Sequence, residues 1–372
     1  MSGSPIPMAR FAAAPGGQMV FIQPGARYPS RPPSLFGYRC DDEPMRAAFV
    51  VVLARRDVPC PTEAVMLYQD AFVLDGKQVV TRDGTGIAES FHDVGAEPWR
   101  HDYQRQQLAK IAAGDVMAVP VAGPPVVAVF KQFSDNFGHV VAEAMPRLLH
   151  LAAMGLSEIR LLLPEEAVPH RVALGFVLRA LGLSAELVVC PEWTVARVAA
   201  LHWVSPPSLY PHRLSPSLSR LMARLVAAAP KDQGPSRLFV ARPDNARRRM
   251  TNGAEVQARA QAAGLVVVEP SRLDFPAQVA LFGAARVVAG AMGAGLTLTA
   301  AMAPGGHVAM FDPGTSDPFF WNIACLGGLA FDWAFTAPVV PGNEAAFRDD
   351  MTVPSGLLDT ILGRLAATGR GD

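Results

Sequence analysis

Residues 286–313 read RVVAGAMGAGLTLTAAMAPGGHVAMFDP, and this stretch determines the fold class that we expect. Two short apolar and β-prone runs, 286–289 and 307–311, predict strands. Between them, residues 296–302 place apolar side chains at helical spacing. A strand, a glycine turn, a helix and a second strand follow one another, which is typical of a parallel sheet covered by helices.

The turn after the first of these strands contains Gly290, Gly293 and Gly295. Glycine has no Cβ, so the backbone there can approach a bulky anionic group closely. The following helix would direct its free N–H groups toward the same anion. The turn therefore predicts a bound nucleotide or phosphate, and it makes the chain a candidate user of a nucleotide-sugar or a dinucleotide.

The chain has 372 residues, half of them apolar, and this length suits two domains of ordinary size. Lys and Arg together number 33, as do Asp and Glu, so we expect no nucleic-acid partner, which would need an excess of cations. The four cysteines form no CxxC pair, which argues against a metal site and against a disulfide framework. They are Cys40, Cys60, Cys190 and Cys325, and we expect reduced structural thiols.

The N-terminal residues 1–36 are rich in proline and glycine, and we expect a poorly ordered lead-in there. Their apolar stretches are too short and too broken for a signal peptide or a membrane span. The expected compartment is the cytoplasm. Peripheral association with the inner membrane stays open, because an apolar surface patch leaves little trace in composition, and so does the oligomeric state.

Residues 37–226 are expected to form a first domain with a β-rich start. From about 45 to 110, runs such as AAFVVVLA and AFVLDGKQVVTRDG resemble strands, with a hairpin turn at Asp75–Gly76. From residue 125 onward, strands and helices alternate, as in a parallel sheet covered by helices. The expected strands are 125–130, 159–163, 186–189 and 197–204, and the expected helices are 137–153 and 170–183.

A second alternating set follows a linker-like segment at 227–236 and is expected to form a separate domain over 237–340. Its expected strands are 237–241, 265–269, 286–289 and 307–311, with helices between them. An amphipathic helix at 355–367 is expected in the tail, 341–372. The expected architecture is two doubly wound α/β domains that face each other across a cleft.

The segment SDNFGHVVAEAMPRLLHL (134–151) holds candidate catalytic side chains. His139 and Glu143 are four residues apart and so share one face of a helix near its start. In open α/β domains that position lines the ligand crevice, although such a pair is more often an ordinary hydrogen bond on a helix. The two residues before Phe137 are good helix caps. Pro146 should kink the helix.

The segment RLFVARPDNARRRMTNGAEV (237–256) adds positive charge. Arg242 ends a strand, and residues 247–249, all arginine, precede a helix that begins near Asn252. An arginine at a strand end beside the glycine turn could hold a diphosphate bidentately. The alternatives are a solvated basic loop for the triplet and a simple helix cap for Asn252.

Taken together, these segments resemble glycosyltransferase family 61, whose bacterial members are often described as capsular polysaccharide biosynthesis proteins. The resemblance covers roughly Val126 to Trp333 and rests on the order of several motifs. These are a helix start, a strand that ends in arginine, an Arg-Arg-x-x-Asn segment, a glutamine, the glycine loop and a closing helix and strand. The matching residues are Asn136, Phe137, His139, Glu143, Pro146, Arg147, Arg242, Arg248, Arg249, Asn252, Gln278, 292–298 and 320–333.

The resemblance implies a GT-B fold of two facing Rossmann-like domains and an inverting transfer from a nucleotide-sugar, such as a UDP-sugar, to a glycan, polysaccharide or lipid-linked acceptor. His139 is the first choice for the general base, ahead of Glu143 and Asp135. No metal and no other cofactor are expected, and a hexosyl- and a pentosyltransferase both stay open. Donor contacts are expected from Asn136, Arg147, Arg242, Arg248, Arg249, Asn252, Gln278, Gly293, Ala294, Gly295, Leu296 and Thr297.

The sequence departs from the family pattern at several positions. Met292 replaces a histidine, Leu298 an asparagine and Gly253 a glutamate. Met310 stands where an acid often ends the next strand. Asp312 follows two residues later, and our hypothesis is that it accepts a ribose hydroxyl.

Two other functions are consistent with the sequence. An NAD(P)-dependent oxidoreductase is one, because Gly293-x-Gly295 after a strand, with Asp312 closing the next strand, imitates a dinucleotide fingerprint. The third glycine position holds Leu298, which argues against it. The other is a scaffold that binds a glycan or nucleotide after its chemistry has decayed. Met292 and Leu298 favour that function, whereas the retained histidine–glutamate pair argues against it.

Overall fold

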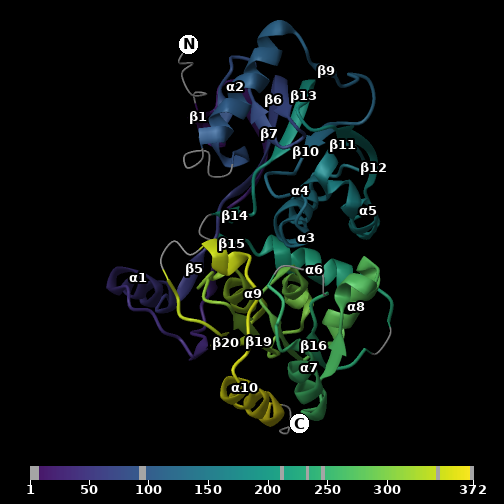
Figure 1. Cartoon of the computed structure of the whole chain (residues 1–372). Coiled ribbons are helices and arrows are strands. Elements are labelled where there is room, and N and C mark those ends of the chain that lie inside the picture. The colour runs from purple at the N-terminus through teal and green to yellow at the C-terminus, as the bar shows by residue number, and fades with distance from the viewer. Residues whose placement is uncertain are drawn as a thin grey trace. The chain divides into compact units, whose positions relative to one another are not determined.

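The computed structural model describes residues 8–91, 98–209, 213–231, 234–243, 248–340 and 344–368, and it has a mixed α/β structure (Figure 1). The chain divides into two structural units. The first contains Met1–Gly25 and Pro61–Ser208, and the second contains Ala26–Cys60 and Leu209–Asp372. Each unit has its own sheet, and both sheets contain parallel strands.

This division differs from the expected one on both sides of the first domain. Residues 8–36 form short strands instead of a poorly ordered lead-in. One of these strands, β4 (Ser34–Phe36), pairs with the last strand of the second sheet and so joins residues 26–60 to the second unit. The second unit also begins before the expected linker at 227–236, because helix α6 (Ser217–Ala228) packs within that unit.

The run AAFVVVLA, which resembled a strand, forms most of helix α1 (Glu43–Leu53). The Asp42 side chain caps this helix by accepting a hydrogen bond from the Met45 amide at 2.7 Å, and Pro44 lies in the first turn. A continuous apolar run does not by itself distinguish a strand from a helix. The cap and the proline before the run are the local features that favour the helix.

Among the described residues, the first unit is built on a ten-stranded mixed sheet. Its order is β1-β8-β7-β6-β13-β10-β11-β12, with β2 paired to β6 and β9 paired to β13. β13, β10, β11 and β12 run parallel, whereas β6 is antiparallel to its neighbours, and the expected turn at Asp75–Gly76 joins β6 to β7. The strands are β1 Met8–Ala9, β2 Gly17–Gln23, β6 Glu63–Leu74, β7 Gln78–Val80, β8 Gly86–Ile87, β9 Met117–Ala118, β10 Val126–Ala128, β11 Glu158–Pro164, β12 Ser184–Cys190 and β13 Val195–Val204.

The expected helix at 137–153 is helical throughout, but its pitch changes along its length. It consists of α3 (Phe137–His139), a π turn η3 (Val140–Ala144), a 3-10 turn η4 (Met145–Arg147) and α4 (Leu148–Ala153). Pro146 has no N–H to donate to an α-helix, and the irregular pitch surrounds it. The other helical segments of this unit are η1 Phe11–Ala13, η2 Ala88–Ser90, α2 Pro98–Ala113, η5 Glu165–His170 and α5 Arg171–Ala180.

The second unit contains a parallel sheet whose described strands follow the order β17-β16-β18-β19-β20-β4. β16 comes first of the central strands in the chain, β17 pairs on one side of it, and the next strands extend the sheet on the other side. The strand order therefore reverses between β16 and β18, the point at which open α/β sheets bind ligands. The strands are β16 Arg237–Val240, β17 Val266–Val268, β18 Val287–Ala291, β19 His307–Asp312 and β20 Ala330–Phe335.

Helices cover both faces of this sheet (Figure 1). On one face, α6, α8 (Phe275–Ala284) and α9 (Phe319–Gly327) pack against η7 (Ala294–Ala301). Segment η7 is a 3-10 helix where the spacing predicted an α-helix. On the other face, α7 (Gly253–Ala262) and α10 (Ser355–Ala367) share a core with β16, β18 and β19.

Short elements complete the description. They are β3 Arg27–Pro29, β5 Asp57–Pro59, β14 Ser208–Leu209, β15 Arg213–Leu214, η6 Pro270–Arg272 and η8 Glu344–Phe347. None of the described helices combines the length and the apolar composition needed to cross a lipid bilayer.

Asp75, in the turn between β6 and β7, makes stability depend on pH. Its buried carboxylate accepts hydrogen bonds from the Thr194 amide at 3.0 Å and from the Tyr103 hydroxyl. Burial raises the pKa of Asp75 to about 6, although Lys77 opposes the shift. The folded state therefore binds this proton more tightly than the unfolded chain does. Stability falls as the pH rises from about 4 to about 6.

We expect Asp75→Asn to remove this loss, since asparagine tolerates the positive φ of 50° at this position. In thermal unfolding, the Tm of the variant minus that of wild type should increase by roughly 2–4 °C between pH 4 and pH 7. Asp83→Asn is the control, because a hydrogen bond from Thr81 lowers the pKa of Asp83. For this variant, the Tm minus that of wild type should decrease as the pH rises. A pH-independent difference for Asp75→Asn would contradict the effect of burial.

Candidate functional site

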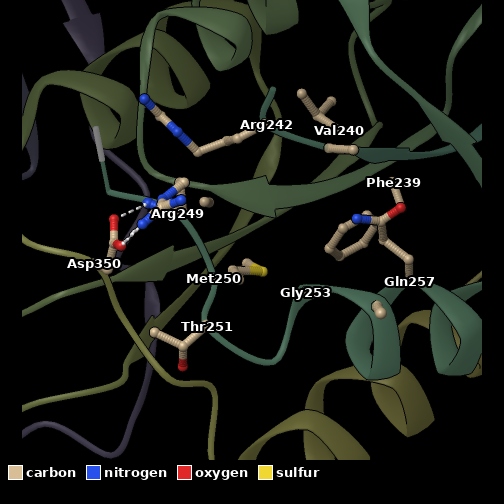
Figure 2. Close-up of a pocket in the computed structure, with 12 residues that line it drawn as sticks. Phe239, Val240, Arg242, Arg249, Met250, Thr251, Gly253, Gln257 and Asp350 are labelled. Carbon is tan, nitrogen blue, oxygen red and sulfur yellow. Dashed lines mark hydrogen bonds and ion pairs between the residues drawn. The ribbon is translucent and has the colours of Figure 1, made fainter. Parts of the chain in front are cut away.

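A cavity of about 540 Å³ opens where the strand order of the second unit reverses (Figure 2). Its walls come from the ends of β16 and β18, from the first turns of α7 and from the segment before α10. Arg242, Arg249, Gly253, Gln257 and Asp350 are among the lining residues. We call it the switch-point cavity, and its position is that of ligand sites in open α/β sheets.

Arg242 follows β16 and brings a partly desolvated guanidinium to the cavity. Its Nη1 donates a hydrogen bond of 2.8 Å to the Met292 carbonyl. Its Nε is buried and has no hydrogen-bond partner among the described residues. Burial and the charge of Arg248 lower the pKa of Arg242 to about 10, while Asp350 opposes this. A bound anion would provide an acceptor and would favour the charged form.

The glycines around the end of β18 make room for the neighbouring strand end. A Cβ at position 293 would lie 1.7 Å from Arg242 Nη1. A Cβ at Gly290 would lie 2.9 Å from the Val240 carbonyl oxygen, and one at Gly295 would lie 3.2 Å from Val240 Cγ1. The sequence predicted a close backbone approach here, and the structure contains one. What approaches the glycines, however, is the end of β16 with Arg242, where the sequence predicted an anionic group.

The turn after Gly293 offers fewer free amides than an α-helix would. The Leu296 amide donates to the Gly293 carbonyl at 2.9 Å within the 3-10 segment η7. Leu296 and Thr297 are fully buried, and the Thr297 hydroxyl has no partner among the described residues. Ala294 and Gly295 are partly exposed. The residues that line the switch-point cavity do not include these four.

The basic segment after β16 is held by a segment 101 residues later. Arg249 donates to Asp350 from its amide at 2.9 Å, from Nε at 3.0 Å and from Nη2 at 2.6 Å (Figure 2). The Thr251 amide donates to the Met351 carbonyl, and the Met351 amide donates to the Arg249 carbonyl, both at 2.8 Å. The hydrogen bond from the Arg249 side chain lowers the pKa of Asp350. Sequence reasoning missed Asp350, since no local pattern connects positions so far apart.

Asn252 lies just before α7, but its side chain does not cap the helix. It donates to the Val353 carbonyl and accepts from the Val353 amide, both at 3.0 Å. The simple-cap alternative is therefore wrong. Gly253 and Ala254, in the first turn of α7, line the cavity, and a helix N-terminus favours an anion.

The remaining expected donor contacts of this unit lie away from the cavity lining. Arg248, with a positive φ of 59°, does not line the cavity but acts on Arg242 through its charge. Gln278 donates to the Leu273 carbonyl at 2.9 Å, at the start of α8. Arg247 lies outside the described residues.

Asp312 has a structural role that conflicts with the ribose hypothesis. It is fully buried and accepts hydrogen bonds from the amides of Gly314 at 2.8 Å and Thr315 at 2.6 Å and from Trp333 Nε1 at 2.8 Å. Burial raises the pKa of Asp312 despite these bonds. Its oxygens are engaged inside the core, which argues against a contact between Asp312 and a ribose.

In the first unit, His139 and Glu143 contact each other on the helical segment. His139 Nδ1 lies 2.7 Å from Glu143 Oε2. Glu143 is buried, and its Oε1 lies 2.8 Å from Lys131 Nζ and accepts a hydrogen bond of 2.6 Å from the Ser208 hydroxyl. Burial alone would raise the pKa of Glu143, but the positive charge of Lys131 and the contact with His139 outweigh burial and lower it. Glu143 is thus a carboxylate fully engaged in orienting its neighbours.

This geometry separates the roles of the two side chains. A carboxylate at Nδ1 favours the tautomer with the proton on that nitrogen, which leaves Nε2 with its lone pair. The His139 side chain is 31% exposed, so it can meet a substrate. Glu143, at 7% side-chain exposure, orients the imidazole. Sequence reasoning missed Lys131 and Ser208. The sequence signal for Lys131 was a lone lysine directly after an apolar strand. No sequence signal marked Ser208.

Arg147 is fully buried and braces the helical segment. Its Nε donates to the Glu143 carbonyl at 3.0 Å, and its Nη1 donates to the Val204 carbonyl at 3.1 Å. Burial lowers the pKa of Arg147 to about 10, and Glu143 opposes the shift. The resemblance implied a donor contact for Arg147, but a guanidinium without exposed surface cannot reach a ligand in this conformation.

Asp135 and Asn136 form the turn before the helix. Asn136 caps α3, since its side chain accepts a hydrogen bond from the Gly138 amide at 2.9 Å. The Asp135 side chain is exposed, and its backbone carbonyl lies 3.0 Å from His170 Nε2. The capping interpretation accounts for Asn136, whereas His139 has the better position for a general base than Asp135, because a buried carboxylate orients its ring.

We expect Gly293→Ala to weaken anion binding in the switch-point cavity at least tenfold, because its Cβ would displace the Arg242 guanidinium. Titration with inorganic pyrophosphate, followed by calorimetry, measures this. Gly253→Ala is the matched control, since its Cβ would be 3.6 Å from the nearest atom, an ordinary contact, in the same cavity. Equal pyrophosphate affinity in both variants would show that the Arg242–Gly293 fit does not matter for binding.

The chain was compared with known proteins and with models of protein families. No curated protein matches the chain. The family model described as Glycosyltransferase 61 matches residues 137–309, a range that contains His139, Glu143 and Arg242. Asn136 and the closing segment 320–333 lie outside the match. Residues 137–309 are therefore similar to glycosyltransferase family 61. The match supports membership of that family and activity as a glycosyltransferase.

Proposed function

We propose that this protein is an inverting glycosyltransferase that moves a sugar from a nucleotide-sugar to an acceptor hydroxyl. The proposal rests mainly on the position and burial of Arg242. Its partly buried guanidinium lies at the switch point of a doubly wound sheet, in a cavity that also contains Arg249 and the N-terminus of α7. Buried positive charge at that position suits a diphosphate. The family match over residues 137–309 supports a glycosyltransferase.

In the proposed reaction, Nε2 of His139 accepts the proton of the acceptor hydroxyl while the hydroxyl oxygen attacks the anomeric carbon. The new C–O bond forms on the face opposite the leaving group, and the bond to the diphosphate oxygen breaks, which inverts the configuration. Arg242 and Arg249 neutralise the charge that develops on the diphosphate. Lys131 and Glu143 keep the imidazole oriented throughout. The transfer requires the two units to act together, and we propose the GT-B arrangement for them.

The finer assignments belong to the same proposal. We propose a UDP-sugar as donor, a glycan or lipid-linked acceptor, and a reaction without a metal ion, because the cavity supplies cationic side chains for the diphosphate. A role in capsule-type polysaccharide synthesis in the cytoplasm or at the inner membrane follows from the resemblance. A hexose and a pentose fit the proposal equally well.

The two alternative functions have less support. No comparison supports an oxidoreductase, and Asp312, which completed the dinucleotide fingerprint, is engaged in the core. The decayed scaffold rested on Met292 and Leu298. Both side chains are buried, and neither lines the switch-point cavity. The two substitutions therefore leave the described lining of that cavity unchanged.

Nucleotide binding tests the proposal. UDP at a hundredfold excess over its Kd should stabilise the protein by about 2.7 kcal/mol in a thermal-shift assay. Arg242→Met should weaken UDP binding by roughly ten- to a hundredfold, the effect of losing one charged hydrogen-bonding group. Arg272→Met is the control, since Arg272 is an exposed arginine that pairs with Glu269 on the surface. Unchanged UDP affinity in Arg242→Met would overturn the donor assignment.

The general base has its own test. His139→Gln should lower kcat by about a hundred- to ten-thousandfold, since it removes proton transfer to a positioned side chain. Glu143→Gln should lower kcat less, because the imidazole keeps its basic nitrogen and loses only the carboxylate that orients it. His170→Gln is the control. A His139→Gln enzyme with near-normal kcat and normal folding would refute the base assignment.

A further inference from the structure

Two aromatic side chains of the first unit are exposed on turns with strained backbone. Phe133 has a φ of 66° and is 40% exposed, and Trp193 has a φ of 63° and is 46% exposed. Bulky residues rarely adopt the left-handed region, and such strain persists only where the surroundings enforce it. Neither ring is buried, so core packing does not explain why an aromatic residue stands at either position.

The two turns are fixed by consecutive glutamates of η5. Glu166 Oε1 accepts a hydrogen bond of 2.9 Å from the Ser134 amide, and Glu165 Oε2 accepts one of 3.0 Å from the Glu192 amide. Glu166 in turn pairs with the buried Lys77 at 3.1 Å. Both aromatic residues are therefore anchored to one short segment. We call Phe133, Trp193 and the turns that carry them the aromatic rim.

The aromatic rim lies at the functional edge of its sheet. The Phe133 turn follows β10, η5 follows β11, and the Trp193 turn follows β12, three adjacent parallel strands. Ligands of α/β sheets bind at the carboxyl ends of such strands. The Phe133 ring centroid lies 5.5 Å from that of His139, with the planes tilted by 32°. Trp193 rests edge-on against Tyr103, at 4.8 Å and 64°.

We propose that the aromatic rim is the acceptor site and that the acceptor is an oligosaccharide or polysaccharide. This inference rests on the proposed transferase function. The C–H faces of a pyranose ring are apolar and stack on aromatic rings, whose own faces attract such C–H groups. Phe133 positions the sugar unit whose hydroxyl meets Nε2 of His139. Trp193 binds a unit farther along the same chain, so longer acceptors bind more tightly.

The experiment titrates the full chain with glucose-, galactose-, xylose- and N-acetylglucosamine-based oligosaccharides of one to six units, followed by calorimetry. Wild type should bind at least one series, with affinity that increases with length. Phe133→Ala should lose at least tenfold in affinity for every length, whereas Trp193→Ala should lose mainly the gain from additional units. In a transfer assay with the same acceptor, Phe133→Ala should raise the acceptor KM more than it lowers kcat.

Phe133→Gly separates the ring from the strained backbone, because glycine adopts the same φ without strain. The proposal requires Phe133→Gly to lose as much affinity as Phe133→Ala. Phe347→Ala, which removes an exposed phenylalanine of the other unit, should bind like wild type. Wild-type affinity in Phe133→Gly, or no binding of any oligosaccharide by wild type, would overturn the proposal. Thermal stabilisation by UDP is measured on the same samples, and it tests the transferase function separately from the acceptor site. Absence of that stabilisation would count against the transferase function.

Discussion

The guanidinium of Arg242 occupies the space that a side chain at position 293 would fill. The ends of β16 and β18 can lie this close only because glycines stand along the second strand end, and the switch-point cavity opens between them. The contact also fixes one guanidinium nitrogen on the Met292 carbonyl and leaves Nε without a partner among the described residues. The steric fit between the two strand ends thus produces a partly desolvated positive charge, which the nearby Asp350 only partly offsets.

In the first unit, a buried side chain carries a negative charge. Glu143 is buried, and an isolated carboxylate there would take up a proton. Lys131, Ser208 and His139 each contact it, and together they keep it ionised. Arg147 holds the backbone of the same residue from the core. The π and 3-10 turns around Pro146 show that the helix departs from regular geometry where this network forms, and such departures are frequent at functional sites.

Apolar periodicity predicted most strands of both sheets and the tail helix α10, because buried faces impose a regular spacing on the sequence. It failed for α1, where a run of valines is compatible with either structure and capping decides locally. The sequence also predicted the His139–Glu143 pair and the meeting of Arg242 with the glycine turn. It could not predict Lys131 or Asp350 as partners, since each depends on how distant segments meet. The ribose hypothesis for Asp312 had no local feature against it, because in a sequence a buried carboxylate that accepts backbone hydrogen bonds cannot be told from a ribose ligand at the end of a strand.

The pairing of residues 249–252 with 350–353 has a consequence for how the protein is made. One wall of the switch-point cavity is supplied by a stretch that the ribosome delivers about a hundred residues after β16. A nascent chain that has completed all six described strands of this sheet still lacks Asp350 and its neighbours, so residues 249–252 do not yet have these partners. The switch-point cavity is therefore among the last features that the growing polypeptide completes, and a product truncated before residue 348 would retain the six described strands of the sheet but not the complete wall of the cavity.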